Sequence, residues 1–398
     1  MKIYFSENKR YSNCGTMQLL RYLISKNNME VVENANNCDI VFVSLFDITE
    51  FSNLRKTYLT FKGKKPVIVG GDVAKLDFVK NYADYICLGE AYHFIEELGK
   101  IKNIKEIENI KNVTTKSKEG IIDYDIDYYK NPLIKASKKV IYYYGGKGCP
   151  QKCKFCFYSH VNSYSQIPES LVLSALKKIP KSTKLYLTSA YFPFPDMQNC
   201  YLKKLGMIDL KIGQYLKRKY PSRSFRMGIE FFKESKRKEM GKPISDEKIT
   251  EAVNKSLYWN HEITMYLLAG LEKQEDMYKF IECFPEYQKT YSPRITIHFQ
   301  YIDFNEKTPL EGLNITQRND FNTDSMQKEF NKKNRRVRVM QIKYKANSTY
   351  RTLLQRTKNK EETEFVYSLR NEKNNDVFIN KVMKIYPELL GIKENIYV

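Results

Sequence analysis

A regular alternation of short apolar strands and amphipathic helices constrains the first 100 residues more than any other feature. Continuous apolar stretches such as DIVFVSL (39–45) and PVIVGGD (66–72) fit strands that are buried on both faces of a sheet. Helical repeats at residues 16–25 and 92–101 separate the strands. The alternation predicts an α/β unit with a Rossmann-like parallel sheet, whose ligands would lie at the carboxyl ends of the strands.

A second series of strands and helices begins at KKVIYYYGGKG (138–148). Expected strands follow at residues 184–192, 224–232, 262–271 and 294–302, and expected helices at 170–179, 202–219, 246–260 and 275–288. Repeated βα units of this kind predict a partial (β/α)6 barrel of the TIM type. The remaining residues are polar, basic and mixed in pattern. We therefore expect a Rossmann-like domain over 1–125, a barrel over 126–312 and a basic carboxyl-terminal extension over 313–398.

Three of the eight cysteines are clustered in the stretch GGKGCPQKCKFCFYSH (145–160), directly after the first strand of the second series. Cys149, Cys153 and Cys156 follow a Cys-x3-Cys-x2-Cys spacing. Three thiolates in eight residues can each bind one iron of a [4Fe–4S] cubane and leave the fourth iron open for a cofactor. A zinc site is the alternative, and it would need His160 as the fourth ligand.

This loop and its setting resemble the radical S-adenosylmethionine (SAM) superfamily, whose cluster loop follows the first strand of a partial barrel. The resemblance implies that the open iron chelates SAM and that reductive cleavage yields a 5′-deoxyadenosyl radical. It also implies a low-potential electron donor such as flavodoxin or ferredoxin.

The resemblance further implies SAM-binding positions, each of which also fits a purely structural role. Family strand endings are matched by RMGIEFF (226–232), MYLLAGLEKQED (265–276) and HFQYIDFNEKTPLEG (298–312). The usual Gly-Gly-Glu of the second strand is replaced by Thr-Ser-Ala (188–190), and Phe231 stands where the family often has serine. The candidate SAM-binding residues are Tyr158, Ser189, Gly228, Glu230, Gly270 and Thr308. No catalytic residue can be named.

The first domain resembles the cobalamin-binding-like domain that precedes many radical SAM barrels. Domains that ligate cobalt use an Asp-x-His-x-x-Gly loop after the first strand, but here the loop reads SENKRYSNCG and has no histidine. Either cobalamin binds without a histidine ligand, or the domain is a scaffold. A second cluster, as in methylthiotransferases, is not expected, because Cys14, Cys38 and Cys87 would not converge at one end of the strands.

Basic residues exceed acidic ones by 67 to 46, which gives a formal net charge of +21. Seven lysines and no acid lie between residues 129 and 168, and eleven basic residues and no acid between 330 and 360. Such zones, interleaved with tyrosines, suit a nucleic-acid track, but a solvated surface or a region near an anionic cofactor fits as well.

From these features we expect a radical SAM enzyme that acts on RNA or DNA, with hydrogen abstraction leading to methylation or another carbon-centred modification. The alternatives are a cobalamin-dependent radical SAM methyltransferase of a peptide or small molecule, and a non-catalytic iron–sulfur or zinc protein that binds nucleic acid. The amino terminus does not resemble a secretory signal and no apolar run is long enough to span a membrane. A soluble, cytoplasmic protein without a membrane partner is expected.

Overall fold

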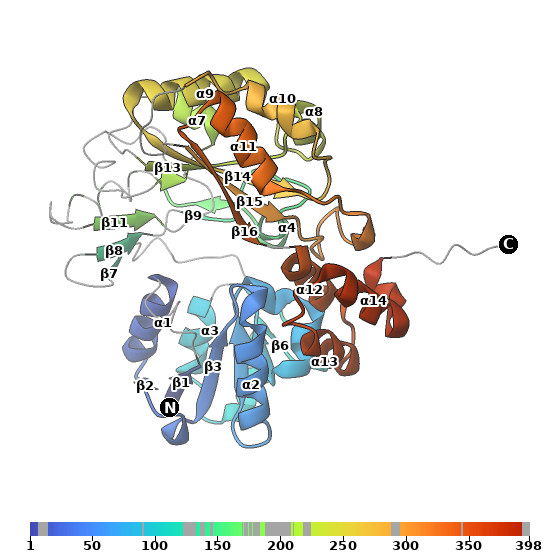
Figure 1. The fold of residues 1–398 in the computed structure, drawn as a ribbon. Coiled ribbons are helices and arrows are strands. Elements are labelled where there is room, and N and C mark those ends of the chain that lie inside the picture. The colour runs from blue at the N-terminus through green and yellow to red at the C-terminus, as the bar shows by residue number, and fades with distance from the viewer. Residues whose placement is uncertain are drawn as a thin grey trace. The chain divides into compact units, whose positions relative to one another are not determined.

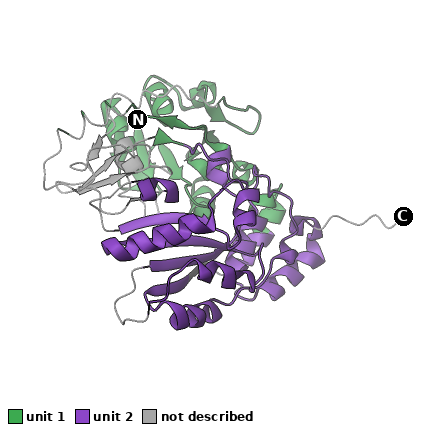
Figure 2. Cartoon of the chain, turned by 90° about the horizontal axis from the view of Figure 1, so that it is seen from above, with its two compact units in different colours: residues 1–147, 161–183, 355–364 green, residues 148–160, 184–354, 365–398 purple. Residues whose placement is uncertain are grey.

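The computed structural model describes residues 1–6, 15–89, 91–121, 133–135, 140–143, 146–168, 170, 174, 177, 184–187, 208–209, 211–217, 224–287, 295–343 and 345–391 (Figure 1). The chain divides into two compact units (Figure 2). Unit 1 comprises residues 1–147, 161–183 and 355–364, and unit 2 comprises 148–160, 184–354 and 365–398. The expected domain boundaries near 125 and 312 stay a prediction.

Unit 1 contains a six-stranded sheet in the order β2-β1-β3-β4-β5-β6. The strands are β1 (Lys2–Phe5), β2 (Glu30–Val32), β3 (Ile40–Ser44), β4 (Val67–Gly70), β5 (Tyr85–Cys87) and β6 (Val113–Thr114). All pairs are parallel except β5 with β6. The strand order reverses between β1 and β3, and such a switch point is where open α/β sheets bind ligands.

The strands and helices expected in the first 100 residues are confirmed. β3 is buried along Ile40–Val43, as its unbroken apolar sequence predicts. Helices α1 (Gly15–Lys26), α2 (Phe51–Phe61) and α3 (Ala91–Leu98) accompany the sheet, and α1 packs beside α3. The core between helices and sheet includes Ile3, Met17 and Phe94. Most of the loop after β1, residues 7–14, lies outside the described residues.

Unit 2 contains a five-stranded parallel sheet in the order β12-β13-β14-β15-β16. Its strands are β12 (Ile208–Asp209), β13 (Ser224–Glu230), β14 (Glu262–Ala269), β15 (Ile295–Tyr301) and β16 (Val337–Lys343). In β13 and β15 every second residue is buried, and those between are half-buried. The alternation arises because successive side chains of a strand point to opposite faces of the sheet.

Helices α7 (Ile212–Lys217), α8 (Glu234–Glu239), α9 (Asp246–Trp259) and α10 (Asp276–Glu282) connect these strands. The earlier part of the second series contains the antiparallel pair β7 (Leu133–Lys135) and β8 (Val140–Tyr143), the short pair β9 (Gly146–Lys147) and β10 (Ser165–Gln166), and β11 (Lys184–Leu187). The expected helix at 170–179 lies largely outside the described residues. The predicted fold class, an α/β chain with a Rossmann-like sheet and a partial barrel, is confirmed.

Two details of the second series differ from expectation. The expected helix at 202–219 covers only α7 among the described residues, and Ile208–Asp209 form the strand β12. The segment expected as an extension contributes α11 (Thr323–Lys333), β16, α12 (Lys345–Arg356), α13 (Lys360–Ser368) and α14 (Asn375–Ile385). β16 was missed because its sequence, VRVMQIK, mixes apolar residues with polar and basic ones: Val337 is buried while Arg338 is exposed.

Candidate functional site

The three clustered cysteines lie in the loop between β9 and α4 (Phe157–Val161) and line one cavity of unit 2. Cys153 is buried, while Cys149 and Cys156 are half-buried, and all three thiols are free. Among the described residues, no three His, Cys, Asp or Glu side chains form a group that could hold a single metal ion. A cubane distributes its thiolates over three irons, and the donor set of this loop, three thiols on one cavity wall, fits that requirement.

Hydrogen bonds within unit 2 fix this loop. The amide of Cys156 donates to the carbonyl of Cys153 (3.0 Å), and the amide of Lys154 donates to the carbonyl of Met240 (3.0 Å). The Tyr158 hydroxyl accepts a hydrogen bond from the amide of Gly148 (3.1 Å). His160, the histidine that a zinc site would need, instead places Nε2 3.1 Å from the carbonyl oxygen of Cys153. Its contact therefore supports the loop backbone.

Gly241, in the chain that follows α8, lies in contact with the cysteine loop. Its φ of +77° is left-handed, and a Cβ there would lie 3.5 Å from Cα of Cys153. The Cys153 thiol lies 3.7 Å from the carbonyl oxygen of Gly241. Burial raises the pKa of this thiol to about 11, partly offset by the Lys242 ammonium. Burial lowers the pKa of Lys211, which lines the same cavity, because it disfavours the charged ammonium form.

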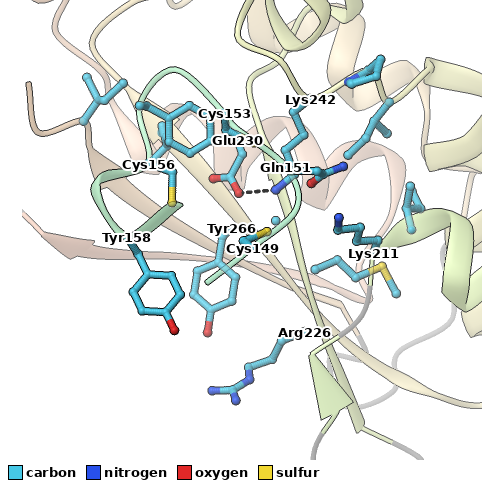
Figure 3. A pocket seen from close by; sticks show the side chains of 18 of the residues that line it. Cys149, Gln151, Cys153, Cys156, Tyr158, Lys211, Arg226, Glu230, Lys242 and Tyr266 are labelled. Carbon is cyan, nitrogen blue, oxygen red and sulfur yellow. Dashed lines mark hydrogen bonds and ion pairs between the residues drawn. The ribbon is translucent and has the colours of Figure 1, made fainter. Parts of the chain in front are cut away.

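An ion pair between Glu230 and Lys242 lies at the carboxyl end of β13 (Figure 3). Their charged atoms are 2.6 Å apart, and both side chains are nearly buried. Glu230 has a φ of +76°, which is rare for a residue with a side chain, and the register of β13 against β14 shifts between Gly228 and Glu230. Strained backbone of this kind is concentrated at functional sites.

Two buried charged side chains bind the backbone that directly follows Glu230. Glu272 accepts hydrogen bonds from the amides of Phe232 (2.6 Å) and Lys233 (2.8 Å). Arg237 is fully buried and donates to the carbonyls of Phe231 (2.9 Å) and Phe232 (2.6 Å). The sequence offered no signal for these contacts, because each joins residues through backbone atoms.

The cavity has a volume of about 700 Å³ and lies at the carboxyl ends of the parallel strands. Of the predicted site residues, it brings together the three cysteines, Tyr158, Gly228 and Glu230. It adds polar and aromatic residues that sequence reasoning did not single out, namely Gln151, Phe155, Lys211, Gln214, Lys217, Arg226, Lys242, Lys248, Tyr266, Gln300, Tyr301, Asp303 and Asn305. The alternation of polar with apolar residues along β13 and β15 is the sequence signal that could have identified this inner face.

Gly270 and Thr308 are not among the described residues that line this cavity. Gly270 has a φ of +112°, and a Cβ there would lie 3.3 Å from carbons of Arg318. The Thr308 hydroxyl donates to the carbonyl of Asn305 (2.7 Å) and accepts from the amide of Leu310 (3.3 Å), which closes a turn. Ser189 lies outside the described residues. Contact of these three residues with SAM stays a prediction.

Several basic residues of the zone at 330–360 have partners within unit 2. Arg351 pairs with Asp303 (2.8 Å), and Lys345 pairs with Asp320 (2.7 Å). Arg336 stacks over the ring of Tyr287 at 4.9 Å. The acids that pair with Arg351 and Lys345 come from other segments, so the absence of acids within the zone overstated its free charge.

No protein-family model and no curated protein sequence matches the chain. Solved structures do share its architecture. The cobalamin-dependent SAM radical enzyme OxsB, solved with aqua-cobalamin and SAM bound, matches with a TM-score of 0.52 and 12% identity over 78% of this chain and 54% of that chain. The radical SAM methyltransferase TsrM from Kitasatospora setae, solved with cobalamin and a [4Fe–4S] cluster, matches with a TM-score of 0.55 and 12% identity over 79% and 77%.

This chain has the fold of cobalamin-dependent radical SAM enzymes. The resemblance drawn from the cysteine loop and the strand endings is thereby confirmed at the level of the fold. A second TsrM structure, with tryptophan substrate and a SAM analogue, matches with a TM-score of 0.55 and 10% identity over 78% of this chain and 74% of that chain. The chain spans about half the length of OxsB. Among the helices that the structure describes, none has the length and apolar character needed to cross a membrane.

Proposed function

We propose that this chain is a cobalamin-dependent radical SAM methyltransferase that acts on a small molecule or peptide. The observation that carries the proposal is the convergence of three free thiols and the Glu230–Lys242 ion pair on one cavity. The cavity lies at the carboxyl ends of parallel barrel strands, which is where enzymes of this architecture bind their substrates.

Cys149, Cys153 and Cys156 would hold the [4Fe–4S] cluster, and the cavity they line would receive SAM. When bound, the reduced cluster supplies the electron that cleaves SAM to methionine and a 5′-deoxyadenosyl radical. Glu230 would accept a hydrogen bond from the ammonium group or the ribose of SAM, and the ion pair with Lys242 would hold its carboxylate in position. Tyr158, tied to Gly148, would cover the cluster side of the cavity and exclude water.

The sheet of unit 1 fits cobalamin at its switch point between β1 and β3. The four histidines of the chain lie at positions 93, 160, 261 and 298, so the loops after β1, β3 and β4 carry none. We propose that cobalamin binds there without a histidine ligand to cobalt. The electron donor, flavodoxin or ferredoxin, stays a prediction.

A nucleic-acid substrate has less support than a small one. The paired residues of the 330–360 zone leave less free charge for phosphate than the sequence indicated. Retardation of tRNA or DNA on native gels, compared between 50 and 200 mM salt as roughly the range over which phosphate contacts weaken, measures any such binding directly.

Anaerobic reconstitution followed by iron analysis and product chromatography tests the proposed function. We expect about four irons per chain, 5′-deoxyadenosine after addition of a reductant and SAM, and S-adenosylhomocysteine once a methyl acceptor is supplied. Cys156→Ala should lose iron and SAM cleavage. Cys283→Ala is the matched control, because Cys283 is a buried free thiol outside this cavity. Full cleavage by Cys156→Ala would refute the proposal.

A further inference from the structure

Tyr266 is an aromatic residue of the cavity wall whose role the cysteines and the ion pair do not explain. It lies in the middle of β14, its side chain is half-buried, and it lines the same cavity as the three cysteines. Figure 3 shows its ring on the wall of the cavity, with the hydroxyl pointing away from the Glu230–Lys242 pair. The ring, rather than the hydroxyl, is therefore the part of Tyr266 nearer to that pair.

The strands on either side of β14 give Tyr266 two very different neighbours. In register, it lies level with Gly228 of β13 and with His298 of β15. The rings of His298 and Tyr266 meet in a T-shaped contact, with centroids 5.3 Å apart and planes at 83°. Burial lowers the pKa of His298, so this imidazole favours its neutral form and does not act as a cation against the tyrosine. His298 thus supports the tyrosine ring without using the attraction of that ring for a cation.

On the other side, Gly228 brings the ion pair close to Tyr266. A Cβ at Gly228 would lie 2.0 Å from Oε1 of Glu230 and 2.5 Å from Nζ of Lys242, so these charged groups occupy the space that a side chain would fill. Adjacent strands are only about 4.8 Å apart. The carboxylate, the ammonium and the base of the Tyr266 side chain therefore border the same part of the cavity.

The acids of the wall already have cationic partners. Among the described residues that line the cavity, the acids are Glu230 and Asp303, which pair with Lys242 (2.6 Å) and Arg351 (2.8 Å). All four side chains are at most 14% exposed, so solvent screens these pairs weakly. A further cation in this part of the cavity needs another source of attraction. The face of the Tyr266 ring supplies one, because its quadrupole attracts a cation without a formal charge.

We propose that the ring of Tyr266 binds the sulfonium of SAM. The inference rests on the proposed function, because it concerns the same SAM site. The sulfonium joins the methionine half of SAM, which the open iron would chelate, to the ribose. Since Glu230 would bind either the ammonium or the ribose, the sulfonium lies within a few bonds of Glu230, in the part of the cavity that Tyr266 borders.

The ring would then distinguish SAM from S-adenosylhomocysteine, the product expected of methyl transfer. The product has a neutral thioether in place of the sulfonium and gains nothing from the quadrupole of the ring. Tyr266 would therefore favour the exchange of product for a new molecule of SAM.

Calorimetric titration of the anaerobically reconstituted full chain, without a reductant so that SAM is not consumed, tests the proposal. The probes are SAM, S-adenosylhomocysteine and sinefungin, which carries a protonated amine in place of the sulfonium. We expect SAM and sinefungin to bind at least about tenfold more tightly than S-adenosylhomocysteine, equivalent to about 1.4 kcal/mol. Tyr266→Leu should remove most of this preference and leave the affinity for S-adenosylhomocysteine nearly unchanged.

Tyr266→Phe should retain the preference, because it keeps the ring. Tyr258→Leu is the matched control, because Tyr258 is an exposed tyrosine of α9 that does not line the cavity, and it should bind all three probes as the wild type does. Binding of S-adenosylhomocysteine by Tyr266→Leu shows that this variant is folded. Should it fail to fold, Tyr266→Met repeats the measurement with a longer side chain.

Three outcomes would overturn the proposal. An equal loss of affinity for SAM and S-adenosylhomocysteine in Tyr266→Leu would show that the ring stacks on adenine. Loss of the preference in Tyr266→Phe would assign the binding to the hydroxyl, and an unchanged preference in Tyr266→Leu would leave the ring without this role. Absence of iron or of SAM cleavage in the wild type would refute the proposed function instead.

Discussion

At the scale of the residue, the site depends on a glycine and a strained glutamate. The Glu230 carboxylate and the Lys242 ammonium lie over Gly228, where an added Cβ would be 2.0 Å from Oε1 of Glu230 and 2.5 Å from Nζ of Lys242. Only a residue without a side chain leaves that space. The family resemblance pointed to Gly228 and Glu230. Only the structure showed that Lys242 pairs with Glu230 and that the pair lies over Gly228.

Gly228→Ala should therefore separate the ion pair and leave the fold intact. The clashing atoms are the ends of two flexible side chains, which can move without displacing the backbone. We expect affinity for SAM to fall at least about tenfold, equivalent to about 1.4 kcal/mol, with little change in the thermal midpoint. Equilibrium dialysis with labelled SAM and circular dichroism measure the two quantities, and wild-type affinity in a folded variant would contradict the expectation.

At the scale of the element, the segment after residue 312 completes the barrel sheet. Helix α11 places Met326 and Phe330 in the core, and β16 then pairs in parallel with β15. The ring of Phe330 is fully buried and meets that of Phe284 edge-on at 4.9 Å. The basic character of the segment concealed this role, because Lys328, Lys332 and Arg338 lie on exposed positions beside a short apolar pattern.

Phe330→Ala should lower the free energy of unfolding by about 3–5 kcal/mol, because it leaves a cavity in a packed core. Lys328→Ala, an exposed position on the same helix, should change it by no more than about 0.5 kcal/mol. Urea unfolding followed by circular dichroism measures both. Equal effects of the two substitutions would show that α11 is not part of the cooperative core.

At the scale of the whole molecule, the chain returns to unit 1 near its end. Residues 355–364 belong to that unit, and Glu364 binds both Arg55 (2.7 Å) and the Tyr82 hydroxyl (2.8 Å). Burial pushes the pKa of Glu364 up, but the hydrogen bonds from Arg55 and Tyr82 outweigh burial and hold that pKa below its ordinary value. Unit 1 is therefore built from segments about 300 residues apart in sequence.

Glu364→Gln should lower the free energy of unfolding at pH 7 by about 1–2 kcal/mol. A carboxyl whose pKa is lowered on folding stabilises the protein above its unfolded pKa and loses that effect as the pH falls through its folded pKa. The difference between wild type and variant should thus shrink below about pH 4. Urea unfolding across this range measures it, with the exposed Glu361→Gln as control; a difference independent of pH would contradict the expectation.

The two proposed cofactors should be lost independently, because one fits each unit. Cys156→Ala should lose iron while retaining hydroxocobalamin through gel filtration at about the wild-type ratio. Atomic absorption and the visible spectrum measure the two contents. Joint loss of iron and cobalamin would indicate that the sites depend on each other.

Much of the fold and part of the site followed from local patterns. Apolar runs such as Ile40–Ser44 identify buried strands wherever they occur, and the spacing of Cys149, Cys153 and Cys156 limits the ligands that three adjacent thiolates can hold. β12 and β16 were not predictable in the same way. One is two residues long, and the other mixes apolar residues with polar and basic ones, so neither carries the unbroken apolar signal of a buried strand.

The sequence by itself determined the fold class and the three cysteines of the proposed cluster loop. Both follow from patterns only a few residues long, namely the continuous apolar runs of buried strands and the close spacing of the three cysteines. Only the tertiary structure decided that Lys242 meets Glu230, that Lys211 and Arg226 share one cavity with the cysteines, and that the basic segment after residue 312 supplies a strand. Those contacts join positions distant in sequence, and charge pairing depends on distance in space, which no local pattern records.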